Sequence, residues 1–423
     1  MILPPPLLLT AAALAAALAG CSHTAPYYRA DVASGAAGPA LPAEDLAFRV
    51  ILIGDAGAPG PREPVLATLK AWGGRDPDRT LVAFLGDNVY EDGFSGADRR
   101  DEERRIERQL ETLEGSPGPR GLFIPGNHDW AGGSQAGLAA LKAQQEYVER
   151  RLSPGSFLPR DGRPGPVKID LPDSAGAVLR LVAVDSQWWL HEGRKPDADR
   201  DRIVAGLVRC LTTDLPVVVL AHHPLESAGN HGGFFDWRDF LFPATRATDA
   251  PWAWLIPAPM LYPLGRRFTP LGTGQDIFAP AYRELKEDLR RASRARDAGG
   301  RLLKPLAYAA GHDHNLQVME GGEFADYLLI SGAGSAVKMR PVGDRPRTLF
   351  AHEHPGFILL DVLADGSVWL RVVEPAFDEA GNQLDPGSEP VTFTLRLRAG
   401  GQPPNPRQSG RLRQALPPTS SRP

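Results

Sequence analysis

The stretch "TLVAFLGDNVYEDG" (residues 80–93) joins a strand pattern to a polar turn. Its first residues are apolar and rich in β-branched and aromatic side chains, as is typical of a strand that is buried on both faces. The apolar run ends at Gly86, Asp87 follows directly, and Tyr90 comes three residues later. A carboxylate at a strand end suits a metal ion, whereas a phenol is a rare metal ligand. The pairing of Asp87 with Tyr90 is therefore the feature that the rest of the sequence has to explain.

The same arrangement recurs four more times along the chain. The polar motifs "GDAG" (54–57), "GNHD" (126–129), "AHHP" (221–224) and "GHDH" (311–314) each follow a short apolar run. Strand patterns alternate with helical ones, which predicts an α/β fold with both faces of the sheet covered. Ligand sites in such sheets gather outside the carboxyl ends of the strands. Five polar motifs at five strand ends therefore predict one shared site.

The sequence patterns place the elements as follows. Strands are expected at 48–54, 80–86, 121–126, 178–185, 216–222, 306–312, 326–332, 356–362 and 367–373. Helices are expected at about 62–72, 98–114, 134–151, 197–211 and 280–297. No internal repeat is visible.

The composition is that of an ordinary globular protein. The chain has 423 residues, 42% hydrophobic, and a formal net charge of -4, which implies no nucleic-acid partner. Only two cysteines are present, Cys21 and Cys210, so a disulfide framework is excluded and packing and metals must hold the fold. Cys210 lies in a helical pattern and is expected to be a buried thiol.

The chain begins with a segment typical of an export signal. Residues 1–20 carry no charged side chain and end in small residues. "LAGC" (18–21) resembles the lipobox of bacterial lipoproteins, which implies an acylated Cys21. We expect an exported, membrane-anchored lipoprotein in the periplasm or at the cell surface; a plain signal peptide and an uncleaved transmembrane anchor are the alternatives. Residues 21–47 are expected to be the lipidated N-terminus and a flexible tether, and 399–423 a disordered tail.

The strand-end motifs supply the donors for two metal ions. First-row divalent and trivalent metals favour carboxylate oxygen and imidazole nitrogen, and two ions ~3.5–4 Å apart can hold the attacking and leaving oxygens of phosphoryl transfer. Such a pair needs about seven protein ligands, one of them a bridging carboxylate. The motifs offer Asp55, Asp87, Tyr90, Asn127, His222, His312 and His314.

In their order along the chain, these five motifs resemble the signature blocks of the calcineurin-like metallophosphoesterases. The resemblance covers roughly residues 48–335. It implies an α/β fold in which two mixed β-sheets, flanked by helices, form a four-layer αββα sandwich. The catalytic domain is then expected to span residues 48–398.

The sequence departs from most of that superfamily at Gly57, where a histidine usually stands two residues after the first aspartate. Tyr90 matches the tyrosinate of the purple acid phosphatases, whose blocks also lack that histidine. "GDNVYEDG" (86–93) and "GHDHNLQ" (311–317) resemble the tartrate-resistant, low-molecular-weight branch. A phenolate is a hard, strongly donating anion and favours Fe(III) over zinc.

The resemblance assigns the donors to two ions. The first, Fe(III), would be bound by Asp55, Tyr90 and His314, with Asp87 bridging. The second, Fe(II), Zn(II) or Mn(II), would be bound by Asn127, His222 and His312. Two carboxylates and a tyrosinate cancel three of the five positive charges, so the remaining charge suits a hydroxide and a phosphate ester dianion.

Two histidines are candidates for the acid that protonates the leaving group. His128 stands beside Asn127, and Asp129 is expected to orient it. His231 is the second candidate, because the tartrate-resistant branch has a histidine at this spacing from His222. His223 is expected to point away from the site or to line its rim. The remaining histidines of the domain, His191, His352 and His354, are expected on the solvated surface.

The predicted activity is hydrolysis of phosphate esters by a metal-activated hydroxide, most closely that of a phosphomonoesterase. A phosphodiesterase or nucleotidase on the same scaffold is an open alternative, and so is a surface lipoprotein that binds metal or phosphorylated ligands without turnover. Residues 225–282 form a long insertion rich in aromatic residues and proline. A lid, a face lying on the membrane and a satellite hydrophobic cluster are its three interpretations.

Overall fold

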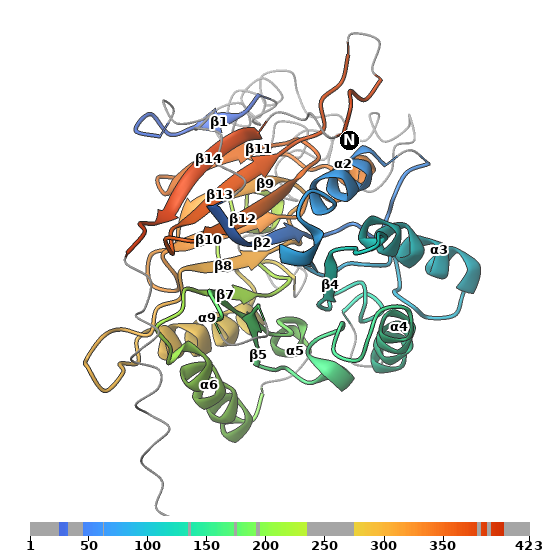
Figure 1. The fold of residues 1–423 in the computed structure, drawn as a ribbon. Helices are drawn as coiled ribbons and strands as arrows, with labels where there is room; N and C mark the ends of the chain where they lie inside the picture. Colours follow the sequence, from blue (N-terminus) through green and yellow to red (C-terminus); the bar gives the residue numbers. More distant parts are fainter. Residues whose placement is uncertain are drawn as a thin grey trace, which may run out of the picture.

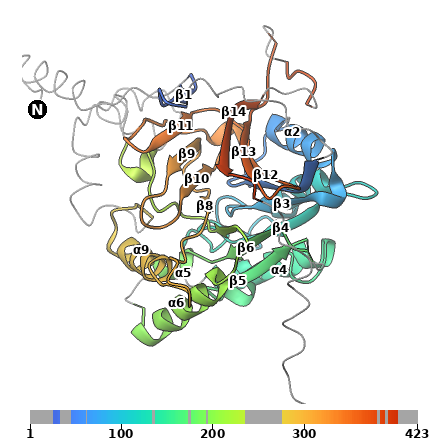
Figure 2. The same ribbon diagram turned by 60° about the vertical axis from the view of Figure 1, so that its left-hand side comes forward.

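Two β-sheets stack face to face, and each carries helices on its outer side (Figures 1 and 2). The computed structural model describes residues 25–32, 45–61, 63–133, 137–172, 176–191, 195–234, 275–378, 382–386 and 391–401. The predicted four-layer αββα sandwich of two mixed sheets is therefore confirmed.

The smaller sheet holds the first three predicted strands. In spatial order it consists of β14 (Val391–Arg398), β13 (Val368–Val373), β12 (Phe357–Leu363), β2 (Leu46–Ile53), β3 (Thr80–Phe84) and β4 (Arg120–Phe123). Strands β2, β3 and β4 run parallel, so their carboxyl ends meet at one edge. Strand β12 pairs antiparallel with β2 and makes the sheet mixed.

The larger sheet has eight strands. In spatial order it consists of β1 (Tyr27–Tyr28), β11 (Thr348–His352), β9 (Leu316–Glu320), β10 (Tyr327–Ser331), β8 (Ala307–Ala310), β7 (Val217–Leu220), β6 (Leu179–Ala183) and β5 (Val167–Leu171). Strands β6, β7, β8 and β10 are parallel, which again brings several carboxyl ends together.

The helices fall into two groups, one on each outer face. The smaller sheet is covered by α2 (Pro64–Gly73), α3 (Arg99–Leu110) and α4 (Leu138–Arg151). The larger sheet is covered by α5 (Gln187–Leu190), α6 (Asp197–Leu211) and α9 (Pro280–Ser293). Short 3₁₀ turns lie at Pro77–Arg79, Glu111–Leu113, Arg160–Gly162, Asn230–Gly232 and Ala336–Lys338.

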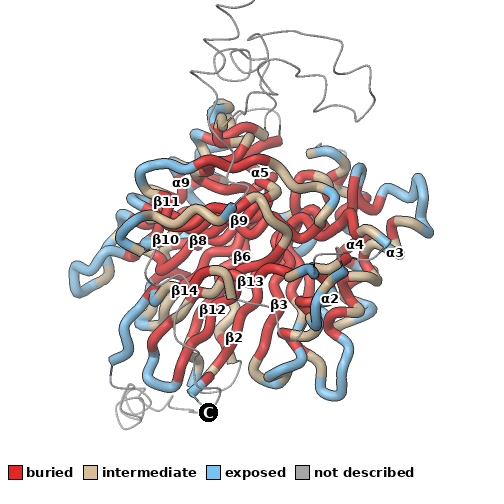
Figure 3. The backbone as a smooth tube through the Cα atoms, turned by 90° about the horizontal axis from the view of Figure 1, so that it is seen from above, coloured by how far each residue is buried: buried red, intermediate tan, exposed pale blue. Residues whose placement is uncertain are grey.

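Strand β2 shows why the apolar runs are continuous. Val50 and Leu52 point into the layer between the sheets, whereas Ile51 and Ile53 pack against the helices. All four side chains are fully buried, as are most strand residues in Figure 3. A strand that is covered on both faces has no solvent side, so its sequence does not alternate between apolar and polar residues.

All nine predicted strands are present, and five further strands were not predicted. Strand β9 illustrates the reason, because it contains the polar residue Gln317. The side chain of Gln317 is fully buried, its oxygen accepts a hydrogen bond from the backbone of Ala228, and its amide donates to Ser227. A buried amide that is satisfied by neighbours distant in sequence cannot be recognised from local periodicity.

Several predictions fall on residues that the structure does not describe. These are the signal segment 1–20, Cys21, most of the tail beyond residue 401, and positions 235–274 of the insertion. Within the expected tether, Tyr27 and Tyr28 instead form strand β1 on β11, and the Tyr28 ring packs against the inter-sheet core. Among the described helices, none is both long and apolar enough to cross a bilayer.

Candidate metal centre

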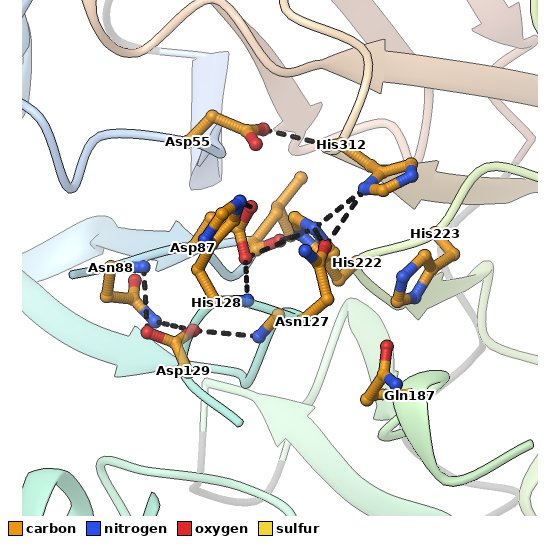
Figure 4. Close-up of polar contacts among 12 residues, drawn as sticks. Asp55, Asp87, Asn88, Asn127, His128, Asp129, Gln187, His222, His223 and His312 are labelled. Carbon is orange, nitrogen blue, oxygen red and sulfur yellow. Dashed lines mark hydrogen bonds and ion pairs between the residues drawn. The ribbon is translucent and has the colours of Figure 1, made fainter. Parts of the chain in front are cut away.

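The five polar motifs meet where the carboxyl ends of strands from both sheets face each other (Figure 4). Asp55 follows β2, Asp87 and Tyr90 follow β3, and Asn127 follows β4. His222 follows β7, and the two histidines of "GHDH" follow β8. The structure thus brings all seven predicted donors together, and their ligand roles remain a prediction.

Three of the donors form a closed triangle. The Tyr90 hydroxyl lies 3.0 Å from Asp55 Oδ1 and donates a hydrogen bond to it. The same hydroxyl lies 3.1 Å from His314 Nε2, and that nitrogen lies 3.3 Å from Asp55 Oδ1. We refer to Asp55, Tyr90 and His314 as the tyrosine triangle.

Three other donors form a second triangle with similar edges. Asn127 Oδ1 lies 3.0 Å from His222 Nε2 and 3.1 Å from His312 Nδ1, and these two nitrogens are 3.2 Å apart. We refer to Asn127, His222 and His312 as the asparagine triangle. Asp87 adjoins it, with Oδ1 3.4 Å from His222 Nε2.

The edges of both triangles fit a metal ion. Ligands bound at about 2.0–2.2 Å and at right angles lie about 3 Å from one another. Each triangle has this spacing, and each combines a hard oxygen donor with imidazole nitrogen, the mixture that first-row transition metals prefer. Together with the fold, the two donor sets support a site for two metal ions.

Backbone carbonyls fix which imidazole nitrogen faces the centre. His222 Nδ1 lies 2.8 Å from Leu85 O, and His314 Nδ1 lies 2.7 Å from Lys338 O. A carbonyl only accepts hydrogen bonds, so these Nδ1 atoms carry protons and the Nε2 atoms face the centre. His312 is reversed, because its Nε2 faces Gln275 O at 3.2 Å and leaves Nδ1 for the centre. Such support orients metal-binding histidines and sets their tautomer.

The protein without metal holds two buried carboxylates at the centre. Among the described residues, neither Asp55 nor Asp87 forms an ion pair with a lysine or arginine. Burial alone would raise the pKa of Asp87, but the His222 and His128 imidazoles lower it below its usual value. The same pairing raises the pKa of His222 to about 9 against the opposing effect of burial. Protons on histidine therefore occupy the place that a metal cation would take.

Tyr90 is a neutral phenol in the protein without metal. Burial raises its pKa well above the usual value, and the negative charges of Asp55 and Asp87 raise it further. Only a strongly charged cation within bonding distance would make it a phenolate. The centroid of the Tyr90 ring lies 4.4 Å from that of the His128 ring and 4.5 Å from Lys338 Nζ.

The backbone at Gly57 explains the missing histidine. A Cβ atom at this position would lie 2.4 Å from the carbonyl carbon of Asn88 and 2.5 Å from Asp87 O. The Gly57 N–H donates to Asp87 O at 3.0 Å, so the loops after β2 and β3 are joined by their main chains. This contact leaves no room for an imidazole at 57 and brings the Tyr90 hydroxyl to Asp55.

Three donor residues adopt a backbone conformation that is unusual for residues other than glycine. Asp55, Asp87 and His312 have φ values of 60°, 54° and 70°. Such left-handed conformations cost free energy and cluster at functional sites, where the surroundings hold them in place. The glycine before Asn127 is required for packing, because a Cβ at Gly126 would lie 2.2 Å from Asp87 Oδ1.

His128 and Asp129 have different surroundings. The His128 ring is partly exposed, its Nδ1 donates to Glu91 O at 2.5 Å, and its Nε2 lies 3.9 Å from Asp87 Oδ2. Asp129 is fully buried and accepts hydrogen bonds from the backbone N–H of Asn88 and of Gly126. Among the described contacts, the Asp129 carboxylate binds the backbone on either side of the centre and does not touch the His128 ring. Its predicted part in orienting His128 stays a prediction.

His231 and His223 lie on the side of the asparagine triangle. The His231 ring is 3.9 Å from the His312 ring, and its Nδ1 is 3.2 Å from Asp276 Oδ1. His223 is fully buried behind His312, with Nδ1 2.8 Å from Ser186 Oγ and Nε2 2.7 Å from the side-chain oxygen of Gln275. Burial lowers the pKa of His223 well below its usual value, so this ring is neutral.

Sequence reasoning missed the residues that support the donors. Asn88 donates to Asp129 and to Ile124 O, and Gln144 donates to Asp129 at 2.9 Å. Gln275, at the end of the insertion, contacts two of the site histidines. Single asparagine and glutamine residues do not change the hydrophobic periodicity of the sequence. Their partners lie tens of positions away along the chain, so only the structure reveals these contacts.

The surface assignment of two other histidines was wrong. His191 is 4% exposed and packs edge-on against Trp130, with 4.5 Å between the ring centroids. His352 is 5% exposed and contacts Glu374. Both rings are buried by elements that are distant in the sequence, so the local sequence does not predict their burial.

One protein family has a model that matches part of this chain. Residues 48–247 match the model of a family described as calcineurin-like phosphoesterase (Metallophos). A search of curated protein sequences finds no match.

Solved structures resemble this chain in fold. One is GAP50, the anchor in the inner membrane complex of Plasmodium, at 15% identity and a TM-score of 0.50, with 84% of this chain and 90% of that chain covered. Purple acid phosphatase PPD1 from yellow lupin (Lupinus luteus) seeds has 14% identity and a TM-score of 0.48, with 82% and 53% covered. A dimetal phosphatase from Danio rerio has 12% identity and a TM-score of 0.41, with 84% and 99% covered. At such identities the likeness concerns the fold alone.

Proposed function

We propose that this chain is a phosphomonoesterase with a dinuclear metal centre, since residues 48–247 match the calcineurin-like phosphoesterase family. The family match supports a metal-dependent phosphoesterase that acts on phosphate esters. The finer proposal concerns the ester class, the metals and the residues that transfer protons.

One observation carries the proposal: two donor triangles with 3.0–3.3 Å edges stand on either side of one buried carboxylate. In this arrangement Asp55, Tyr90 and His314 would hold the first ion. Asn127, His222 and His312 would hold the second, with Asp87 between them. When bound, two such cations lower the pKa of a coordinated water and stabilise the charge of the phosphoryl group.

The side chains around the triangles would handle the substrate and its proton. His128 has its Nδ1 proton fixed by Glu91 O, which leaves Nε2 to exchange a proton at the open side of the centre. We assign to it the protonation of the leaving oxygen. His231 stands against His312 on the other side and is 26% exposed, so we assign to it a hydrogen bond to the phosphate. Asp276 would hold the His231 ring in place.

The tyrosine triangle favours iron as the first metal. Tyr90 donates through oxygen, and its partner Asp55 is also an oxygen donor, so this triangle is harder than the asparagine triangle with its two imidazoles. We therefore propose Fe(III) next to Tyr90 and Fe(II), Zn(II) or Mn(II) in the asparagine triangle.

We also propose that the protein is exported and attached to a membrane through an acylated Cys21. The support is the apolar segment 1–20 and the "LAGC" stretch that ends it. A Cys21→Ala variant should appear in the soluble fraction of the expressing bacterium, whereas the unaltered chain should sediment with membranes. An equal distribution of the two would contradict the anchor.

Activity towards a series of esters tests the proposed function. The metal-loaded protein should hydrolyse phosphomonoesters and leave diesters nearly untouched. A preference for diesters or nucleotides would select the phosphodiesterase or nucleotidase alternative, and a lack of turnover with every ester would indicate a binding protein.

The leaving-group series separates the two histidines. His128→Ala should slow alkyl phosphates, whose leaving oxygens need a proton, roughly 10²–10⁴-fold, and should slow aryl phosphates with good leaving groups much less. His231→Ala should slow both classes by a similar factor, because it acts on the phosphate. The reverse pattern would assign the acid to His231.

A further inference from the structure

A second group of metal-type side chains lies where the edges of the two sheets meet. His352 ends β11 of the larger sheet, His354 follows two residues later, and Glu374 comes directly after β13 of the smaller sheet. We refer to these three residues as the edge cluster. It shares no residue with the two triangles, and their chemistry does not require it.

The three side chains present donor atoms to one another. His352 Nδ1 lies 2.8 Å from Glu374 Oε1, and His354 Nδ1 lies 3.9 Å from Glu374 Oε2. The two imidazole rings are nearly parallel, with 5.0 Å between their centroids and an angle of 13°. Both rings thus turn the same kind of nitrogen towards one carboxylate. Ligands of a tetrahedral zinc ion are about 3.3 Å apart. One ligand atom from each of the three residues lies within 4.8 Å of the others, so small side-chain rotations would bring them to this spacing.

The carboxylate is held in place from the smaller sheet. Glu374 is 6% exposed, and its Oε2 accepts a hydrogen bond of 2.8 Å from Thr392 Oγ1 in β14. The Tyr28 hydroxyl of β1 donates to the backbone oxygen of Thr392 at 2.9 Å. Gly356 permits this closeness, because a Cβ there would lie 3.2 Å from Glu374 Cγ and 2.5 Å from Val373 O.

A simple ion pair does not account for the arrangement. A protonated His352 would pair with Glu374 and satisfy the carboxylate, but it gives no reason for a second imidazole stacked parallel to the first. A cation that binds two neutral imidazoles and one carboxylate uses all three donors.

We propose that the edge cluster binds a third metal ion, a divalent cation of the zinc type, which links the two sheets. Two imidazole nitrogens and one carboxylate oxygen are a donor set that zinc favours. Glu374 and His352 are buried, whereas the His354 side chain is 30% exposed, so the remaining coordination position faces solvent and would be filled by water. His354 Nδ1 now lies 3.0 Å from Pro355 O, and binding would replace that contact with the bond to the metal.

Counting metal ions in paired variants tests the proposal. The full chain would be stripped with a chelator, reloaded with excess Zn²⁺, freed of unbound ions and analysed by mass spectrometry for zinc per chain. We expect His354→Ala to retain one zinc ion fewer per chain than the unaltered protein. Glu353→Gln, which changes the carboxylate between the two histidines, should retain as many zinc ions as the unaltered protein.

Because His354 is partly exposed, its truncation should leave the fold intact, which the circular dichroism spectrum would verify. Ester hydrolysis per chain should be equal in His354→Ala and the unaltered protein. The edge cluster is not a metal site if the two proteins bind the same number of zinc ions. A loss of activity together with the third ion would also overturn the proposal, since it would mean that the cluster is part of the first centre.

This experiment is independent of the proposed function. Phosphoesterase activity reports on the two triangles, whereas the difference of one zinc ion between His354→Ala and the unaltered chain reports only on the edge cluster. Failure of either therefore leaves the other standing.

Discussion

Asp87 lies between the tyrosine triangle and the asparagine triangle, and the residues on either side of it explain its placement. Its backbone oxygen accepts from Gly57, its Oδ1 accepts the backbone N–H of His128 at 2.9 Å, and its chain continues to Tyr90. At the scale of single residues, the chemistry of the centre therefore depends on one exchange. A glycine replaces the usual histidine at 57, and a phenol enters from 90.

Removal of the phenol oxygen tests that exchange. Tyr90→Phe keeps the ring that packs against His128 and deletes only the hydroxyl. We expect the iron-loaded protein to lose its visible absorption band and its iron affinity to fall at least ~10-fold, the lower range seen even for residues that act behind a ligand. Absorption spectra and iron titrations measure both. An unchanged band in Tyr90→Phe would show that Tyr90 does not bind iron.

Addition of one methyl group at Gly57 tests the close contact of the two loops. Gly57→Ala should lower the free energy of unfolding by ~1–3 kcal/mol. The new Cβ would clash with backbone atoms of the loop after β3, which can be relieved only by a shift of the whole loop. The shift of Asp87 should also lower the metal content. Gly60→Ala is the matched control, since its Cβ would meet no atom closer than 3.8 Å and should change stability by less than about 0.5 kcal/mol. Equal denaturation midpoints for the two variants would refute the contact.

At the scale of elements, the helices hold the strands whose ends carry the donors. Helices α6 and α9 cover the larger sheet and are joined by a buried ion pair. Arg200 donates to both oxygens of Asp288 at 2.9 and 3.0 Å, and Trp189 of α5 donates to the same carboxylate at 3.0 Å. Arg291 adds a longer contact of 3.3 Å to Asp288 Oδ1. Asp288 is fully buried, so these three side chains stabilise its charge.

Truncation of the arginine should destabilise the fold without altering the centre. Arg200→Ala removes the closest cation from the buried Asp288 carboxylate and leaves it only the longer contact with Arg291 at 3.3 Å, which should cost up to ~3–5 kcal/mol. Arg202→Ala in the same helix removes an ion pair whose arginine is 75% exposed and should cost less than about 0.5 kcal/mol. Urea denaturation compares the variants. Similar midpoints for both would mean that the buried pair does not support the packing of α6 on α9.

The short helix α5 ends beside His191, which should contribute to acid sensitivity. Burial, followed by the charge of Lys195, lowers the pKa of His191 to about 4. The unfolded imidazole titrates near 6.5. Between pH 6.5 and about pH 4, His191 is protonated in the unfolded chain but neutral in the folded chain. Its contribution to the free energy of unfolding is therefore complete above pH 6.5 and is lost as the pH falls. His191→Phe keeps a ring against Trp130 and should make the acid limb shallower. Denaturation midpoints from pH 4 to 8 would contradict this if both slopes were the same.

Across the whole molecule, the sequence predicted the metal-type donors better than the residues that hold them in place. The donors follow apolar runs directly, so strand-end position and residue type place all seven in one region, and the structure brings them together. Asn88, Gln144, Gln275 and the edge cluster were not foreseen. Their contacts depend on how distant loops fold over one another, and polar side chains at such positions look like surface residues in the sequence. The burial of His191 and His352 was missed for the same reason.

Two metal ions are expected to occupy the two triangles on either side of Asp87. Crystals grown with iron and zinc allow anomalous scattering to be measured at both absorption edges. We expect two peaks roughly 3.5–4 Å apart. Iron should lie within bonding distance of Asp55, Tyr90 and His314, and the second ion within bonding distance of Asn127, His222 and His312. A fully loaded crystal with no peak near Asp87, or with a single peak that contacts neither triangle, would contradict this expectation.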